Sequence, residues 1–239
     1  MDISLTSDMR MRYARLLGIE GVGVEGLEKI LCGKVLIIGA GALGSVCAMY
    51  LAGSGVGCIG IAEFDTIDLS NLQRQVFFST DDCGAPKLST IVRKIHDLNP
   101  GVLVKEYPML MKRDIAVEVY PEYDFIIDAT DNPSSKKMTD SVASTLGIPY
   151  CIGGVREAEG QVMSWTPGAL RYSDIFPEAG CSGFTPCSIA GVLGPAAGVV
   201  ASIQAAEAIK YLSGVGTPLF NRLWTFNLFT LHTSIITLA

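Results

Sequence analysis

A glycine-rich turn is the first part of this sequence that can do chemistry. The turn GAGALG (residues 39–44) follows the apolar run VLII (residues 35–38), which is typical of a strand entering a nucleotide-binding turn. In such a turn Gly39 permits the tight bend, Gly41 lets a phosphate approach the backbone, and Gly44 lets helix and strand pack closely. Free amide groups at the start of the next helix would hold the phosphate. Ser-Val follows the turn instead of Lys-Ser, so it is not a P-loop.

Four charged residues downstream extend this turn into a candidate reaction site. Glu63 ends a second apolar run, where an acidic residue accepts hydrogen bonds from ribose hydroxyls. Arg74 and Lys87 are placed to neutralise a polyphosphate, and Asp131 could hold a Mg²⁺ ion that bridges phosphate oxygens. Mg²⁺ and fixed cations together would stabilise the charge that develops as pyrophosphate leaves the α-phosphorus.

Each of these residues also has an ordinary structural interpretation. Glu63 could be a simple strand-end carboxylate, Arg74 a solvated loop charge and Lys87 a surface residue at a helix start. Asp131 and Asn132 could form the N-cap of a helix that begins at the next proline. The ordered set makes these separate explanations much weaker than a shared nucleotide site.

Composition restricts the class of protein. The 239 residues are 49% hydrophobic with a mean hydropathy of +0.38, and two uncharged stretches (35–62 and 179–206) are interrupted by glycine or proline. Buried α/β elements explain these stretches better than membrane spans do. The N-terminus lacks a signal-peptide pattern, so a cytoplasmic location is expected. A net charge of −6 argues against nucleic acid as a partner.

Cysteine and histidine usage favours neither a metal centre nor a disulfide framework. The seven cysteines include no CxxC pair. The two histidines, His96 and His232, are interpreted as structural or surface residues.

The order of elements predicts a doubly wound, mostly parallel α/β sheet with helices on both faces, N-terminal helices and C-terminal antiparallel strands. We expect helices at 7–31, 43–52, 87–98, 133–146 and 195–212, and strands at 35–38, 58–62, 102–106, 123–128, 149–152, 161–165, 223–227 and 229–237. Residues 161–165 alternate like an exposed strand, and residues 166–188 are expected to be a long loop.

Motifs along nearly the whole chain resemble those of the ThiF/MoeB/HesA family, the bacterial relatives of ubiquitin-activating enzymes. SNLQRQ, with its downstream lysine and TDN, is far more specific than the glycine turn. The motifs are RYAR (12–15), GAGALG (39–44), YLA through GVG (50–57), SNLQRQ (70–75), DCG with Lys87 (82–87), Asn99-Pro100, TDN (130–132), Gly160-Gln161, and AGV through QAAEAIK (190–210).

The resemblance implies an enzyme that uses ATP and Mg²⁺ to adenylate the C-terminal Gly-Gly carboxylate of a small ubiquitin-like sulfur carrier, with release of pyrophosphate. A sulfur donor protein would then act on the acyl adenylate. It also implies a single domain over residues 1–239, with a nucleotide-binding half at about 1–152 and a carrier-binding half at about 153–239.

The resemblance also assigns roles to residues. Asn71, Arg74 and Lys87 would contact the triphosphate, Asp131 would lie by the α-phosphate and Mg²⁺, and Arg15 would reach into the partner's site in a homodimer. The full expected nucleotide-binding set is Gly39, Gly41, Gly44, Glu63, Asn71, Arg74, Lys87, Asp131, Asn132 and Arg15, and the expected catalytic set is Arg74, Lys87, Asp131 and Cys187.

This sequence departs from the family pattern at three places. Glu63 replaces the ribose-binding aspartate and lengthens that arm by one methylene. Arg171 and Asp174 stand where the first zinc-binding cysteine pair would be, and no second pair follows, so zinc is not expected.

Cys187 lies where ThiF-type members place a cysteine that bonds covalently to the carrier, although it could equally be a small buried residue. Cys181 is a weaker candidate.

Two other functional classes share part of the pattern. An NAD- or FAD-dependent oxidoreductase would explain the glycine turn and Glu63 but not SNLQRQ or Lys87. A catalytically silent scaffold that binds a ubiquitin-like protein would explain the missing zinc ligands but not the retained Arg74, Lys87 and Asp131. Within the preferred class, a ThiS-like carrier for thiamine thiazole synthesis is placed first and a MoaD-like carrier for molybdopterin second.

Overall fold

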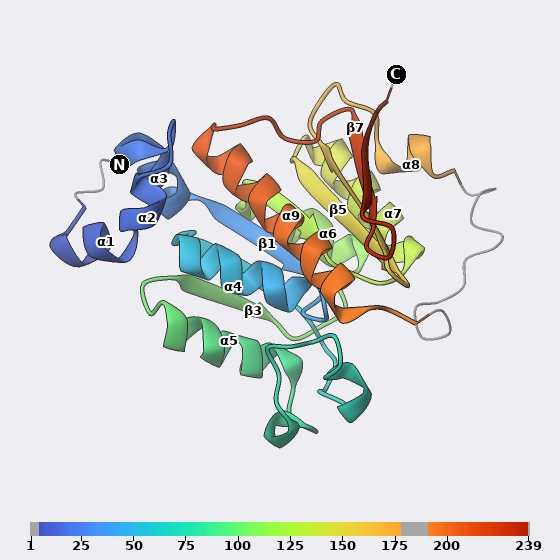
Figure 1. Cartoon of the computed structure of the whole chain (residues 1–239), viewed down its shortest axis with the longest axis horizontal. Coiled ribbons are helices and arrows are strands. Elements are labelled where there is room, and N and C mark those ends of the chain that lie inside the picture. Colours follow the sequence, from blue (N-terminus) through green and yellow to red (C-terminus); the bar gives the residue numbers. More distant parts are fainter. Residues whose placement is uncertain (1–4, 178–190, 239) are drawn as a thin grey trace.

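A single eight-stranded sheet runs through the centre of the protein in a computed structural model that describes residues 5–177 and 191–238 (Figure 1). Its strand order is β3-β2-β1-β4-β5-β6-β7-β8. The strands are β1 (Lys34–Ile38), β2 (Cys58–Ala62), β3 (Leu103–Tyr107), β4 (Phe125–Asp128), β5 (Tyr150–Arg156), β6 (Glu159–Trp165), β7 (Arg222–Asn227) and β8 (His232–Thr237).

The first five strands are parallel, and β1, β2 and β4 are largely buried between two helical layers, whereas β3 is a partly exposed edge strand. β1 pairs with β2 and with β4 in parallel, so its four apolar residues have partners on both sides. Val35 and Ile37 pack into one core cluster, while Leu36 and Ile38 pack into the other. Burial on both faces explains why this strand reads as a continuous apolar run. From β5 onward, each strand pairs antiparallel with the next.

Helices cover both faces of the sheet, as the sequence predicts. The helices α4 (Gly44–Ser54), α5 (Lys87–Leu98) and α9 (Gly194–Ser213) lie on one face, and α6 (Arg113–Val119) and α7 (Pro133–Leu146) lie behind the sheet in Figure 1. The parallel strands require such crossovers, which bring all their carboxyl ends to one edge. That edge is where open α/β sheets bind ligands.

The glycine turn has the backbone that its sequence predicts. Gly39 has φ +90°, which is favoured by glycine. A Cβ atom built on Gly44 would lie 1.7 Å from the Gly39 carbonyl oxygen, so helix α4 can approach β1 only with glycine there. The turn therefore fixes the start of α4 against the carboxyl end of β1.

The N-terminal segment is helical as predicted, whereas β6 differs from the sequence prediction. The helical segment expected at 7–31 consists of α1 (Ser7–Arg12), α2 (Ala14–Leu17) and α3 (Gly23–Cys32). β6 is not an exposed strand: its residues 162–165 are all buried, because Val162 packs with α9 in one core cluster while Met163 and Trp165 pack into the cluster on the other face.

Two short helices were not predicted. α6 is only seven residues long, and α8 (Tyr172–Ile175) interrupts the loop expected at 166–188. Both are too short to show a clear helical period in the sequence. In the part of the chain that the structure describes, no helix is both long and apolar enough to span a bilayer.

Candidate active site

A cavity of about 1080 Å³ lies at the carboxyl edge of the parallel strands. Segments that follow β1, β2 and β4, together with β5 itself, line its inner part, while β6, β7 and β8 contribute to its outer part. The structure brings together most of the predicted nucleotide-binding residues there, namely Gly39, Gly41, Glu63, Asn71, Arg74, Lys87, Asp131 and Asn132. Residues from three separate stretches of the chain therefore converge on one site.

Glu63 organises the backbone at the inner end of the cavity. Its Oε2 accepts a hydrogen bond from the Ala40 amide at 2.8 Å, which ties the glycine turn to the end of β2. Its Oε1 accepts hydrogen bonds from the amides of Phe64 at 2.7 Å and Asp65 at 2.9 Å. Glu63 is buried, so this carboxylate positions two ligand-binding segments at once. A carboxylate has lone pairs to spare for a ribose hydroxyl.

Lys87 presents a buried cation to the cavity. Its ammonium group lies 3.0 Å from an Asp65 carboxylate oxygen, and the exposed fractions of the two side chains are 7% and 53%. The more exposed Asp65 is well solvated, so the pair contributes little to stability. A polyphosphate with its higher charge can compete with Asp65 for this ammonium group.

Arg74 and Asn71 are placed by a short 3-10 helix, η1 (Leu69–Asn71), that follows β2. Asp68 caps this helix, and the Asn71 side chain accepts a hydrogen bond from the Asp68 amide at 3.3 Å. The Arg74 guanidinium donates to the Ser70 carbonyl at 3.1 Å. The SNLQRQ motif is thus a compact turn that directs Asn71, Arg74 and Gln75 into the cavity.

Asp131 and Asn132 follow β4 and have different local roles. The Asn132 side chain accepts a hydrogen bond from the Ser135 amide at 2.8 Å, so it caps helix α7 as the structural interpretation predicts. Asp131 is exposed in the cavity and makes no hydrogen bond or ion pair within the described part of the chain. Its carboxylate is available to a ligand.

Two buried residues at the site were missed by the sequence analysis. The Lys136 ammonium group lies 3.4 Å from Asp128, whose carboxylate is fully buried at the end of β4. Gln75, the last residue of SNLQRQ, is also buried and lies against Gly41. Lys136 stands four residues beyond the TDN motif, and that spacing was the available signal.

The outer part of the cavity is a polar groove across the antiparallel strands. Gly153 and Gly154 form its inner end on β5. His232 is exposed, as predicted for a surface residue, and it lines the outer end, where it hydrogen-bonds with Ser234 at 2.9 Å. The other polar residues lining this part are Arg156, Glu159, Gln161, Thr225 and Asn227.

Comparison with known proteins identifies the family of this chain. The model of the ThiF family matches residues 13–239. The chain belongs to the ThiF family. A probable adenylyltransferase/sulfurtransferase MoeZ of Mycobacterium tuberculosis is 36% identical over 98% of this chain, which spans 62% of that relative's length.

Other members of the ThiF family are covered more completely. The sulfur carrier protein adenylyltransferase of Thermus thermophilus is 36% identical over 90% of this chain and 82% of the relative. The sulfur carrier protein ThiS adenylyltransferase of Escherichia coli is 35% identical over 87% of this chain and 83% of the relative. A crystal structure of E. coli MccB with MccA-N7isoASN superposes with a TM-score of 0.84 at 25% identity, covering 95% and 72% of the two chains. The predicted family and fold are therefore confirmed.

The residues at the site fit Mg²⁺ only together with a nucleotide. Within residues 5–177 and 191–238, no group of three or more His, Cys, Asp or Glu residues could hold a metal ion. Mg²⁺ commonly uses one or two carboxylates together with substrate phosphates and waters. The unpartnered Asp131 carboxylate suits that mode of binding, so Mg²⁺ at Asp131 stays a prediction.

Several other predicted residues lie elsewhere. Gly44 packs beneath the turn and does not line the cavity, while Arg15 is an exposed residue of α2 outside it. Arg171 and Asp174 form an ion pair with a 3.2 Å separation. Cys181 and Cys187 lie outside the described residues, so the catalytic role of Cys187 stays a prediction.

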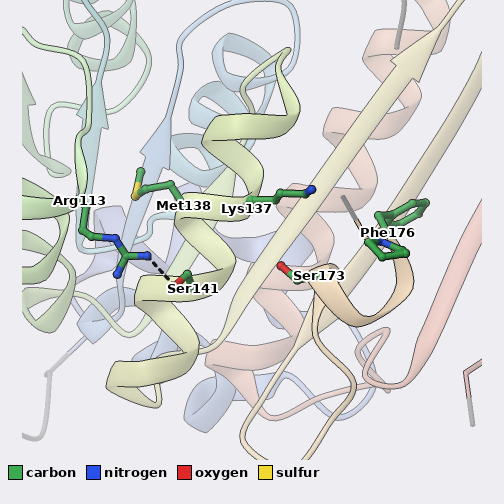
Figure 2. Close-up of a pocket in the computed structure, with 7 residues that line it drawn as sticks. Arg113, Lys137, Met138, Ser141, Ser173 and Phe176 are labelled. Atoms are coloured by element: carbon green, nitrogen blue, oxygen red, sulfur yellow. Dashed lines mark hydrogen bonds between the residues drawn. The ribbon is translucent and has the colours of Figure 1, made fainter. Parts of the chain in front are cut away.

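A second, smaller cavity of about 350 Å³ lies among α6, α7 and α8 (Figure 2). Arg113 donates a hydrogen bond to the Ser141 hydroxyl at 2.7 Å there. Lys137 and Ser141 project from the same helix (Figure 2). None of the predicted nucleotide-binding residues lines this cavity, although Phe176 and Pro177 line both cavities.

Proposed function

We propose that this chain adenylates the C-terminal Gly-Gly carboxylate of a small ubiquitin-like sulfur-carrier protein, using ATP and releasing pyrophosphate. The observation that carries the proposal is the convergence of Arg74, Lys87 and Asp131 on one cavity beside Gly41. Two fixed cations and an unpartnered carboxylate are what a triphosphate and its metal need. Three ThiF-family relatives named as adenylyltransferases support this chemistry.

The residues divide the work by position. The turn at Gly41 receives the phosphates on its backbone, and Glu63 receives the ribose. Arg74 and Lys87 bind the polyphosphate and stabilise the pyrophosphate as it leaves. Asp131 would hold Mg²⁺, which supplies charge neutralisation at the phosphate oxygens when bound. A carrier carboxylate oxygen attacks the α-phosphorus, and the bond from that phosphorus to the bridging oxygen breaks with its electron pair passing to pyrophosphate.

The polar groove across β5 to β8 suits an extended peptide with a small C-terminus. Gly154 lines it where it meets the nucleotide end, and a Cβ atom built there would contact only Gln161, at 3.5 Å, so little side-chain volume restricts the passage. A Gly-Gly tail can pass through such a passage because glycine lacks a side chain. The carboxylate would then enter from the side of β5 and meet the phosphate on the side of β4.

The pathway and the assembly belong to the same proposal. We place a ThiS-like carrier for thiamine thiazole synthesis first, with Cys187 as the residue that could bond to it, and a MoaD-like carrier for molybdopterin second. A sulfur donor protein would supply sulfur to the adenylate. We also propose a cytoplasmic homodimer in which Arg15 completes the site of the partner.

The test is carrier-dependent exchange of pyrophosphate into ATP in the presence of Mg²⁺. ThiS-like and MoaD-like carriers ending in Gly-Gly are supplied separately to wild type, to Asp131→Ala and to the control Lys137→Met. We expect exchange that requires one carrier, falls at least about 100-fold in Asp131→Ala and stays unchanged in the control. ATP binding without exchange for any carrier would favour the silent scaffold and contradict the proposal.

A further inference from the structure

Lys136 is a buried cation held by acceptors from two different strands. Its ammonium group donates to the Thr130 carbonyl at 2.6 Å and to the Gly153 carbonyl at 2.7 Å. Asp128 accepts from it at 3.4 Å. The side chain is 9% exposed and lies in the wall of the cavity. All three ammonium hydrogens therefore have acceptors, and the group has a fixed position.

The two carbonyl groups belong to opposite halves of the site. Thr130 immediately precedes Asp131, whose carboxylate faces the nucleotide end of the cavity. Gly153 begins the Gly-Gly pair of β5, which lines the groove from the other side. Beyond the Asp128–Ile152 pair, the two segments continue past the end of the β4–β5 register. Lys136 bridges them at the point where the sheet no longer does.

Asp128, at the end of β4, completes this hydrogen-bond network. Its Oδ1 accepts hydrogen bonds from the Thr130 amide at 3.0 Å and the Thr130 hydroxyl at 2.6 Å. Its Oδ2 is buried and has no hydrogen-bond partner in the described structure. A buried carboxylate with one unpaired oxygen requires the nearby ammonium group for charge compensation. Asp128 and Lys136 therefore hold the Thr130 segment from both sides.

We propose that Lys136 is a positioning residue that fixes the Asp131 segment relative to Gly153 and thereby aligns the attacking carboxylate with the α-phosphorus. This inference rests on the proposed adenylation. Lys136 does not touch the reacting atoms; it sets the separation of the two segments that hold them. Alignment affects the chemical step far more than ground-state binding, because a displacement of about 1 Å can lower a rate by about 100-fold.

The experiment separates alignment from folding with a charge-balanced variant. Lys136→Met alone would leave Asp128 uncompensated, so Lys136→Met is combined with Asp128→Asn, which keeps an oxygen for Thr130. Asp128→Asn alone and Lys137→Met serve as controls, since Lys137 lines the small cavity and does not line the candidate active site. Lys136→Arg tests rescue, because a guanidinium group can donate to two carbonyl oxygens. Melting temperature, ATP affinity, and kcat and KM for exchange are measured for each.

The expected result is a folded double variant that binds ATP within about threefold of wild type but exchanges pyrophosphate about 100-fold more slowly. We expect Asp128→Asn alone to lose much less, and Lys136→Arg to recover at least part of kcat. A folded double variant with unchanged kcat would overturn the inference, as would a loss confined to ATP affinity or KM.

A wild type that shows no exchange with any carrier would contradict the proposed function instead. Positioning is then read from amide hydrogen exchange in peptides that cover residues 129–132 and 152–155. Faster exchange in both peptides of the double variant, relative to Asp128→Asn and Lys137→Met, is the expected result. Unchanged exchange in either peptide would show that Lys136 does not join the two segments.

Discussion

At the residue scale, most charged groups of the site form hydrogen bonds or ion pairs within the protein in addition to facing a ligand. Glu63 accepts hydrogen bonds from three backbone amides, and Lys136 donates to two backbone carbonyls. Lys87 has a counter-ion in Asp65, whereas Asp131 has no partner in the described part of the chain. The fixed groups determine the shape of the site, and Asp131 is left free to bind.

Replacing Glu63 tests its structural role. In Glu63→Gln, an NH₂ group takes the place of one carboxylate oxygen and faces an amide donor, so a buried hydrogen bond is lost. We expect the free energy of unfolding to fall by about 1–3 kcal/mol, measured by urea denaturation. Glu106→Gln, at an exposed position, should stay within about 0.5 kcal/mol of wild type. Equal stabilities for the two variants would contradict the role given to Glu63.

At the element scale, short capped turns fix the position of the helices whose residues line the site. Ser79 and Asp82 form a capping box around the 3-10 helix η2 (Thr80–Asp82), just before α5 and Lys87. Asp82 also pairs with Arg93 at 2.9 Å and Lys94 at 3.6 Å on α5. This cluster fixes the loop that delivers Lys87 to the cavity.

The Asp82 cap gives a prediction about acid stability. Hydrogen bonds from Ser79, with weaker help from Lys94 and Arg93, lower the pKa of Asp82 to about 2. The pKa of an aspartate in the unfolded state is about 3.9. Between these two pKa values the unfolded state binds more protons than the folded state. The free energy of unfolding therefore falls as the pH drops through this window. Urea denaturation from pH 2 to 6 should show a shallower pH dependence for Asp82→Asn. Asp81→Asn is the exposed control, and identical slopes in wild type and Asp82→Asn would refute the prediction.

At the scale of the whole molecule, a single chain builds the cavity except for the predicted contribution of Arg15. Arg15 is exposed on α2, outside the cavity lining of its own chain. A C2 dimer would place the same surface of each protomer against the other, so both sites would gain the same residue. Mixing two inactive variants can therefore show whether one subunit supplies Arg15 to the site of the other.

Mixed variants test this cross-subunit site. Arg15→Ala and Asp131→Ala should each have little exchange activity, but a mixed dimer would contain one site with both residues intact. After subunit exchange of an equal mixture, we expect about a quarter of wild-type activity, because half of the dimers are mixed and each has one intact site. Activity that stays at the level of the single variants, once light scattering and tag-based pull-down show mixed dimers, would contradict the shared site.

The sequence by itself determined those features that depend on neighbouring residues. The apolar runs of β1 and β2, the glycine turn and the helix start at Pro133 were predicted because strand burial, turn geometry and N-capping act over a few residues. The SNLQRQ, lysine and TDN motifs likewise predicted most of the cavity lining, since parallel strands bring their carboxyl ends to one edge.

Only the tertiary structure decided the features that depend on contacts between distant segments. β6 is buried because α9, which begins almost 30 residues later in the sequence, packs on one of its faces and residues such as Tyr150 and Tyr172 pack on the other. His232 reaches the cavity because β8 joins the far side of the sheet, and Lys136 acts at the site because Gly153 lies beside Thr130. A pattern of local hydrophobicity carries no information about such pairings, since a side chain's acceptors and its burial are set by whichever segment packs against it.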